Sequence, residues 1–189
     1  MSIATSGDDF WVFGYGSLMW RPGFAFVEQR RALVRGWRRS LCVYSHIYRG
    51  TPERPGLVLG LDRGGSCYGV AFRVARPEWP ATLTYLRERE LVTDVYRERQ
   101  VKLDFGSDEG DTGLTYVADR AHAQYAGRLE RRRLLELVCG SSGQAGANAD
   151  YVLNTQAHLA ALGIHDAGLE WLAAQLCRQG ANAGAATGR

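Results

Sequence analysis

The sequence is poor in the features that mark several protein classes. Its 189 residues include four cysteines and four histidines, and none of them forms a CxxC pair or shows the spacing of a metal site. No apolar run approaches the roughly 20 residues that a membrane-spanning helix needs, and we expect no signal peptide. These absences predict a chain without metal, structural disulfide or membrane span, with reduced thiols, located in the cytoplasm.

Charge is too evenly balanced to identify a partner. The net charge is +3, and the hydrophobic and charged fractions of 46% and 23% are those of an ordinary globular protein. Arginines gather in two stretches, 29–40 and 128–137, and the first surrounds Trp37. Nucleic-acid binding through Trp37 is one interpretation, but it requires a larger basic surface or a recognisable module. We favour a solvated sheet face there and expect no nucleic-acid partner.

Up to Ala118 the chain is mostly strand-like. Apolar and β-branched runs separated by glycines and prolines predict short strands. Gly36 should bend a long strand, and Gly64 and Gly65 should form a turn between two others. The expected strands are Phe10–Phe13, Arg31–Ser45, Leu57–Leu61, Ser66–Val74, Val95–Leu103 and Leu114–Ala118.

Helical spacing of apolar residues dominates after Gly127 and also marks one earlier segment. Pro77 opens that earlier helix, which runs to Glu90. Asn148 and Asp166 are candidate N-caps of later helices. The expected helices in the second part of the chain cover residues 128–139, 148–162 and 166–180, with glycines at 163 and 180 ending the last two.

No internal repeat or linker divides the chain. We therefore expect one domain over residues 1–180, of the α+β class, in which helices pack against a small antiparallel sheet or barrel. The tail, residues 181–189, has too little apolar content to pack, and we expect it to be disordered.

The stretch Phe10–Trp20, FWVFGYGSLMW, breaks an apolar strand with two glycines around one tyrosine. Glycines at a strand end can take positive φ and can turn backbone N–H groups outward, where they bind an anion. An ordinary turn between strand and loop is the alternative. The stretch alone does not decide between them.

The helix after Pro77 carries the sharpest chemical signal. At about 100° per residue, Trp79, Leu83 and Leu86 form one stripe, and Glu90 continues it, whereas Glu88 falls on the opposite side. A carboxylate that faces the apolar interior has a raised pKa, a charged partner, or both. Glu90 is thus a candidate general base. A structural role, at a frayed helix end or in an ion pair with a nearby arginine, is the alternative.

Four segments in order resemble the ChaC family of glutathione-specific γ-glutamylcyclotransferases: VFGYGSLMWRPGF, GVAFRV, YLRERELVTDVYRERQV and GANADYVLNTQAHLAALGIHD. The resemblance runs from about Phe10 to about Leu176. It implies a cytoplasmic enzyme that cleaves glutathione into 5-oxoproline and cysteinylglycine without a cofactor. The implied fold is a small mixed or antiparallel β-barrel of the γ-glutamylcyclotransferase-like type, with surrounding helices and a helical C-terminal segment.

The resemblance also implies roles for individual residues. The Arg-Glu pair at the helix end places the catalytic carboxylate at Glu90, as the helical periodicity does. Tyr151 falls where the family carries a tyrosine near the pocket. The loop that would bind the γ-glutamyl head of the substrate consists of Val12, Phe13, Gly14, Tyr15, Gly16 and Ser17.

Two other functions fit the same residues. The chain could cyclise other γ-glutamyl amino acids or amines, because only the pocket for the leaving amine would differ. It could also be a non-catalytic module that binds γ-glutamyl groups. Glu90 argues against that second function, because a pure binding site has no need of a buried base.

Overall fold

The computed structural model describes residues 9–106 and 110–186, with side chains to residue 179. The chain divides into two compact units. Unit 1 comprises Met1–Arg39 and Gly60–His122, and unit 2 comprises Ser40–Leu59 and Ala123–Arg189. The two long strands of the fold contribute residues to both units.

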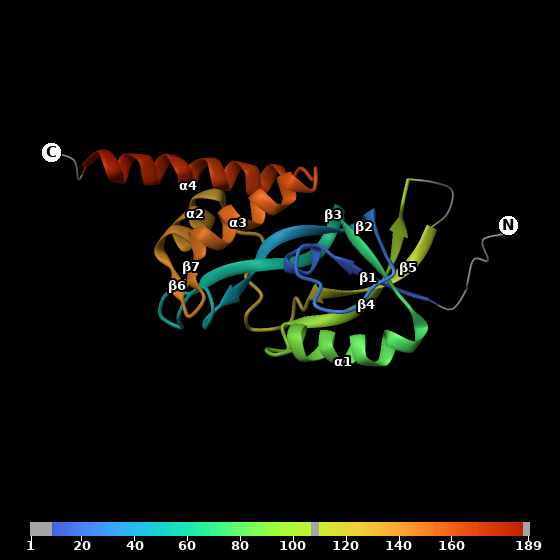
Figure 1. The fold of residues 1–189 in the computed structure, drawn as a ribbon. Coiled ribbons are helices and arrows are strands. Elements are labelled where there is room, and N and C mark those ends of the chain that lie inside the picture. Colours follow the sequence, from blue (N-terminus) through green and yellow to red (C-terminus); the bar gives the residue numbers. More distant parts are fainter. Residues whose placement is uncertain (1–8, 107–109, 187–189) are drawn as a thin grey trace. The chain divides into compact units, whose positions relative to one another are not determined.

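Strands close into a barrel whose main part belongs to unit 1. They are β1 (Phe10–Gly14), β2 (Glu28–Ser45), β3 (Gly56–Val74), β4 (Tyr96–Asp104) and β5 (Gly110–Ala118). Their order around the barrel is β1-β3-β2-β4-β5 (Figure 1). β1 runs antiparallel to β3 but parallel to β5. The predicted small mixed barrel with helices is therefore confirmed.

Glycines shape the two long strands in different ways. Gly36 has a φ of 82° inside β2, which is the predicted bend. Gly64 and Gly65 also have positive φ, 95° and 74°, but β3 runs through both without a break. The prediction of two strands separated by a turn is wrong here. Positive φ at two successive glycines is therefore accommodated within one continuous strand.

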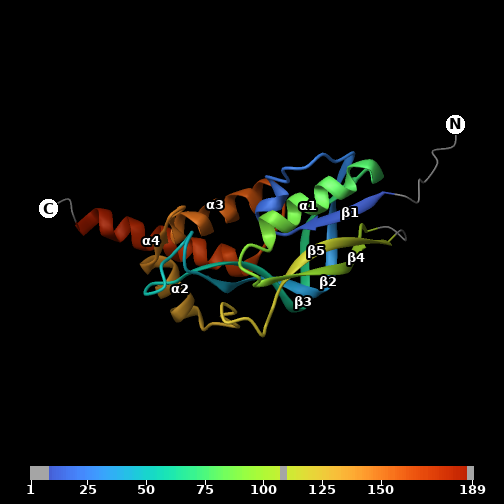
Figure 2. The same cartoon turned by 90° about the horizontal axis from the view of Figure 1, so that it is seen from below.

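Helix α1 (Trp79–Glu90) lies against the outside of the barrel and follows a short 3-10 turn, η2 (Arg76–Glu78) (Figure 2). Leu86 of α1 is fully buried. It belongs to a core cluster whose other members come from β1, the following turn, β3 and β5: Val12, Leu18, Val74, Leu114 and Tyr116. Burial of each such side chain contributes about 1.5 to 3 kcal/mol, so this cluster fixes α1 on the barrel.

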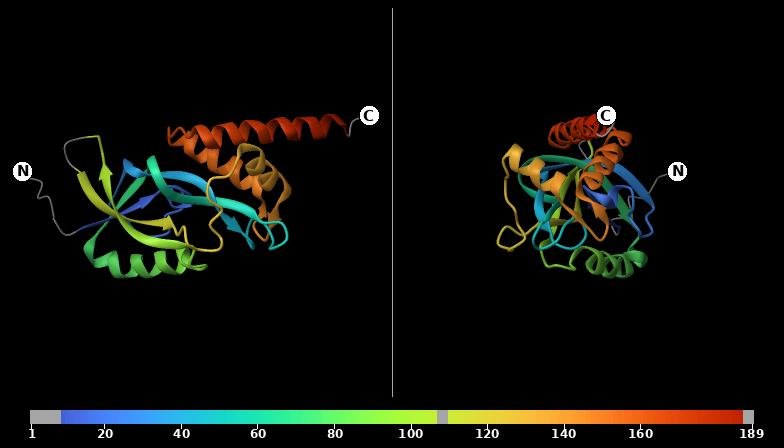
Figure 3. Two further views of the ribbon diagram at one scale, coloured as in Figure 1. Left: turned by 180° about the vertical axis from the view of Figure 1, so that it is seen from behind. Right: turned by 90° about the vertical axis from the view of Figure 1, so that its left-hand side faces the viewer.

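Unit 2 contains three helices that pack side by side, α2 (Arg131–Gly140), α3 (Asn148–Ala161) and α4 (Ala167–Ala186) (Figure 3). A short hairpin of β6 (Ser142–Gly143) and β7 (Gly146–Ala147) joins α2 to α3. The side chain of Asp166 accepts hydrogen bonds from the backbone N–H groups of Gly168 and Leu169, at 3.2 and 3.1 Å. This is the predicted N-cap. Among the described residues, no helix is long and apolar enough to span a membrane.

Helix starts, one cap and one helix end differ from the predictions: α1 begins at Trp79 instead of Pro77, and α2 begins at Arg131 instead of residue 128. Asn148 is buried, and its side chain holds the backbone of Leu57 by two hydrogen bonds, at 2.8 and 2.7 Å, instead of capping α3. The helix end predicted at Gly180 is wrong, because α4 continues to Ala186. Four of the residues 181–186 are alanines, the strongest helix formers. Residues 187–189 of the expected tail lie outside the described residues.

Candidate functional site

The turn after β1 is compact. Met19 N–H donates to the Gly16 carbonyl at 2.9 Å, and Ser17–Met19 form a 3-10 turn, η1. A Cβ atom on Gly14 would lie 3.0 Å from Leu18 Cβ. Neither Gly14 nor Gly16 has positive φ, and Gly16 has a φ of −132°. The prediction of positive φ is therefore wrong, and Gly14 serves close packing of η1 onto the strand end instead.

Side chains at the start of this loop point into the protein. Val12 and Phe13 are fully buried, and the Phe13 carbonyl accepts a hydrogen bond from the Thr115 hydroxyl at 2.9 Å. Tyr15 is buried as well, whereas Ser17 is exposed. Of these residues, Val12 and Phe13 anchor the loop, so any contact they make with a ligand is through the backbone.

An arginine outside the loop fixes its middle. Arg39 of β2 donates to the Tyr15 carbonyl and to the Tyr68 carbonyl, both at 2.6 Å. The neighbouring Arg38 pairs with Asp62, whose side chain is 1% exposed. The arginine-rich stretch around Trp37 is therefore only partly the solvated face that the sequence predicts. No pattern in the sequence indicates the roles of Arg38 and Arg39, because these roles depend on contacts with residues distant in the chain.

Glu90 is the last residue of α1, and its side chain is 19% exposed, whereas Glu88 is exposed to solvent. This confirms the distinction drawn from helical periodicity. Burial raises the pKa of the Glu90 carboxyl, and the positive charge of Arg89 partly opposes that rise. The ion pair expected for a structural role is also present, with Arg89 Nε 3.2 Å from Glu90 Oε1.

Arg89 joins the predicted base, Glu90, to the predicted substrate loop. Its guanidinium donates to the Ser17 hydroxyl at 2.9 Å and to the Arg21 carbonyl at 2.6 Å. It also donates to the Tyr85 hydroxyl, one helical turn earlier, at 2.9 Å. One side chain thus contacts both the predicted substrate loop and the predicted base, so the structure brings these two parts together.

A tyrosine that sequence reasoning missed lies near the base. Tyr116 is 1% exposed and donates to Glu98 Oε1 at 3.3 Å, and Glu98 pairs with Arg87 of α1. Burial, followed by the nearby charges of Glu98 and Glu90, raises the pKa of the Tyr116 phenol. The phenol therefore stays neutral. Only the register of β4 and β5, which pairs Glu98 with Tyr116, could have revealed it.

Tyr151 lies on α3 in unit 2. Its hydroxyl accepts a hydrogen bond from the Leu59 backbone N–H at 3.1 Å, and the guanidinium carbon of Arg49 lies 5.3 Å from the centre of its ring. These contacts hold the tyrosine within its own unit. Its role at a substrate pocket stays a prediction.

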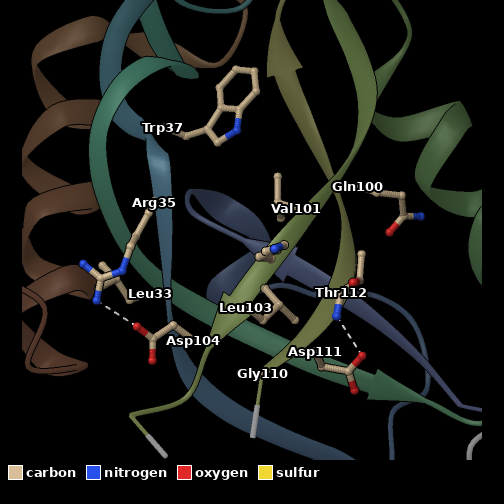
Figure 4. Close-up of a pocket in the computed structure, with 11 residues that line it drawn as sticks. Leu33, Arg35, Trp37, Gln100, Val101, Leu103, Asp104, Gly110, Asp111 and Thr112 are labelled. Carbon is tan, nitrogen blue, oxygen red and sulfur yellow. Dashed lines mark hydrogen bonds and ion pairs between the residues drawn. The ribbon is translucent and has the colours of Figure 1, made fainter. Parts of the chain in front are cut away.

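A cavity of ≈ 800 Å³ opens in unit 1 at the place where Leu33 of β2 pairs with Asp104 of β4 (Figure 4). Its walls come from β2, β4 and β5 and include Trp37 and Thr112. Neither the Tyr15 loop nor Glu90 lines this cavity, so it is not the place where the predicted loop and the predicted base meet. No group of three or more histidine, cysteine, aspartate or glutamate side chains among the described residues is placed to hold a metal ion.

These parts suit proton transfer next to a bound polar group. Glu90 is a carboxylate whose raised pKa brings it closer to neutrality, which is what a general base requires. The loop beside it is fixed at Tyr15 by Arg39 and at Ser17 by Arg89. A held loop next to a base can orient a substrate whose own groups react with each other.

Known proteins similar to this chain share its sequence pattern and its fold. The glutathione-specific γ-glutamylcyclotransferase of Escherichia coli is 34% identical over 84% of this chain and 69% of its own length. γ-Glutamylcyclotransferase 2-3 of Arabidopsis thaliana is 32% identical over 88% of this chain and 87% of its own length. A crystal structure of a yeast γ-glutamylcyclotransferase specific to glutathione superposes with a TM-score of 0.80, at 18% identity, over 91% of this chain and 97% of that one. The ChaC-like protein family model matches residues 10–179, so this chain belongs to the ChaC-like protein family.

Proposed function

We propose that this protein cleaves glutathione into 5-oxoproline and cysteinylglycine, with Glu90 as the general base. One observation carries the proposal: a half-buried carboxylate with a raised pKa is joined by Arg89 to the loop after β1. The family and the names of the relatives supply the substrate class, and the site supplies the group that moves the proton.

The reaction needs only one proton carrier. The α-amine of the γ-glutamyl group is an ammonium at neutral pH, and Glu90 takes a proton from it. The free amine nitrogen attacks the γ-carbonyl carbon, so a C–N bond forms and closes the five-membered lactam. The bond from that carbon to the cysteine nitrogen breaks, and Glu90 returns the proton to the leaving nitrogen. The ring nitrogen then gives its second proton to Glu90, which passes it to the released amine, so that the products are the neutral lactam and an ammonium.

Orientation of the substrate provides the second contribution to the rate of the reaction. Ring closure is intramolecular, so holding the γ-glutamyl chain in a folded conformation accelerates it. In this proposal the backbone from Val12 to Ser17 holds the α-carboxylate, with Gly14 and Gly16 allowing close approach. Tyr151 is proposed as a further substrate-binding residue. Because backbone groups bind the α-carboxylate in this proposal, the ionisable side chain that the reaction uses is that of Glu90.

We also propose that the enzyme works in the cytoplasm. None of the four cysteines, at positions 42, 67, 139 and 177 of the described chain, forms a disulfide. Thiols persist where the compartment is reducing. Expression with a fluorescent tag in a native host, followed by fractionation, tests this location.

The test of function is incubation of the purified protein with glutathione and, in parallel, with γ-glutamyl-alanine, followed by measurement of 5-oxoproline. We expect 5-oxoproline and cysteinylglycine from glutathione, and far less product from the dipeptide. Equal release from both would replace the proposal by a general γ-glutamyl cyclotransferase. Glutathione binding without product from either would indicate a binding module.

A further inference from the structure

We propose that Arg89 is a positioning residue that holds the substrate loop and the general base in a fixed position relative to each other. This inference deepens the proposed function and rests on it. Arg89 would not touch substrate. It would act through the groups it holds, on the loop after β1 and at the end of α1.

On the loop side, the Arg89 guanidinium contacts one acceptor at the start of η1 and two that follow it. It donates to the Ser17 hydroxyl at 2.9 Å and to the Arg21 and Pro22 carbonyls at 2.6 and 3.3 Å. Three acceptors spread over residues 17–22 fix the far end of the loop, whose near end is held by Arg39. A planar guanidinium with five N–H groups can make this set of contacts, and an ammonium cannot.

On the helix side, the same group is itself held in place. Tyr85, four residues earlier on α1, accepts a hydrogen bond from Arg89 at 2.9 Å, and Arg89 Nε lies 3.2 Å from Glu90 Oε1. The Arg89 side chain is only 23% exposed, so its charge is poorly screened by solvent. The planar guanidinium of Arg89 would therefore transmit a displacement of the loop to the base.

The charge of Arg89 has a separate effect on the base. It lowers the pKa of the Glu90 carboxyl against the rise caused by burial. Tyr116, which interacts with the charge of Glu90, stays neutral, and Glu98, which accepts from Tyr116, is paired with Arg87. Removal of the Arg89 charge should thus raise the pKa of Glu90 further and move the acid limb of kcat/KM to higher pH.

The experiment compares Arg89→Met, Arg89→Lys and Ser17→Ala with the unaltered enzyme. Arg97→Gln is the matched control, because Arg97 forms an exposed ion pair with Asp119 in the same unit. Glutathione turnover is measured across pH. Hydrogen exchange of the amides of residues 15–21 is followed by mass spectrometry, a readout that does not depend on activity.

For Arg89→Met we expect kcat/KM to fall about 10²-fold, the acid limb to move to higher pH, and the amides of residues 15–21 to exchange faster. Arg89→Lys should restore the acid limb, because it keeps the charge, but not the exchange rate or all of kcat/KM. Ser17→Ala should raise KM several-fold with kcat retained. Arg97→Gln should match the unaltered enzyme in every readout.

Unchanged exchange in Arg89→Met would overturn the inference, and so would turnover within about twofold of the unaltered enzyme. Full restoration by Arg89→Lys would also overturn it, since charge alone would then be sufficient. If the unaltered enzyme released no 5-oxoproline, the proposed function would fail, and the exchange data would still decide whether Arg89 holds the loop.

Discussion

Two carboxylates in unit 1, one buried and one half-buried, have different surroundings. Asp62 on β3 is 1% exposed and pairs with two arginines, Arg38 and Arg120, the latter at 2.7 Å. Glu90 at the end of α1 is 19% exposed and has one charged partner, Arg89, which it shares with the loop. Asp62 is thus fully compensated, while Glu90 is not.

The difference separates a structural carboxylate from a reactive one. Two guanidinium groups compensate the buried charge of Asp62 and tie it into the barrel wall. Incomplete compensation leaves burial as the main influence on Glu90 and raises its pKa. The comparison predicts that Glu90 matters for turnover and Asp62 for stability.

The largest expected effect is on turnover. Glu90→Gln keeps the shape of the side chain but removes the proton acceptor, so kcat should fall about 10²- to 10⁴-fold. The measurement is 5-oxoproline release from glutathione. Glu88→Gln, on the exposed side of the same helix, is the control and should leave kcat unchanged. Near-normal turnover in Glu90→Gln would remove the general-base assignment.

The converse prediction concerns Asp62. Asp62→Asn leaves two arginines without their shared carboxylate, and breaking such a buried pair costs on the order of 3 kcal/mol. Both arginines reach solvent, at 37% and 48% exposed, so the loss should lie at the lower end of the usual range. Urea unfolding measures it. Arg35→Gln, which breaks an exposed pair with Asp104, should cost less than about 1 kcal/mol.

For Asp62→Asn, turnover per folded molecule distinguishes a role in stability from a role in catalysis. It should stay near that of the unaltered protein at a temperature where the variant is folded. A loss of kcat as large as that of Glu90→Gln would erase the distinction between the two carboxylates.

A smaller effect is expected at Gly14, which fixes the distance between the loop and the barrel. An added Cβ would lie 3.0 Å from Leu18 Cβ and 3.3 Å from the Met19 nitrogen, so η1 must shift by a few tenths of an ångström. Gly14→Ala should raise KM for glutathione several-fold. Gly110→Ala, whose Cβ would lie an ordinary 3.5 Å from the Leu103 carbonyl, should leave KM unchanged.

The sequence predicted what depends on local periodicity. The strands, the course of α1 and the inward direction of Glu90 follow from spacing along one element. Gly36 bends its strand as predicted, because positive φ is a property of that one residue. Gly64 and Gly65 have the same conformation, yet β3 continues through them. Whether a bend ends a strand depends on its neighbours in the sheet.

Contacts between elements distant in the sequence were not predictable in this way. Asn148 has the residue type of a helix cap, but the backbone of Leu57, 91 residues away, takes both of its polar atoms. The same limit applies to Arg39 on the Tyr15 carbonyl and to Tyr116 beside Glu98. Of the predicted site, periodicity therefore indicated the inward direction of the candidate base, Glu90, while the groups that contact it became visible only in three dimensions.

The smallest expected effect is on the pH dependence of stability, which gives a further distinction between Glu90 and Asp62. The folded-state pKa of Glu90 is raised, so folding favours the protonated form. Its contribution to stability is present below the unfolded-state pKa and is lost as pH rises through the folded-state pKa. At neutral pH the ionised carboxylate therefore opposes folding, and Glu90→Gln should be at least as stable as the unaltered protein there. This advantage should shrink as the pH falls, as measured by urea unfolding at several pH values. Asp62→Asn should instead lower the free energy of unfolding at neutral pH. If Glu90→Gln also lost stability at neutral pH, Arg89 would compensate Glu90 as fully as two arginines compensate Asp62.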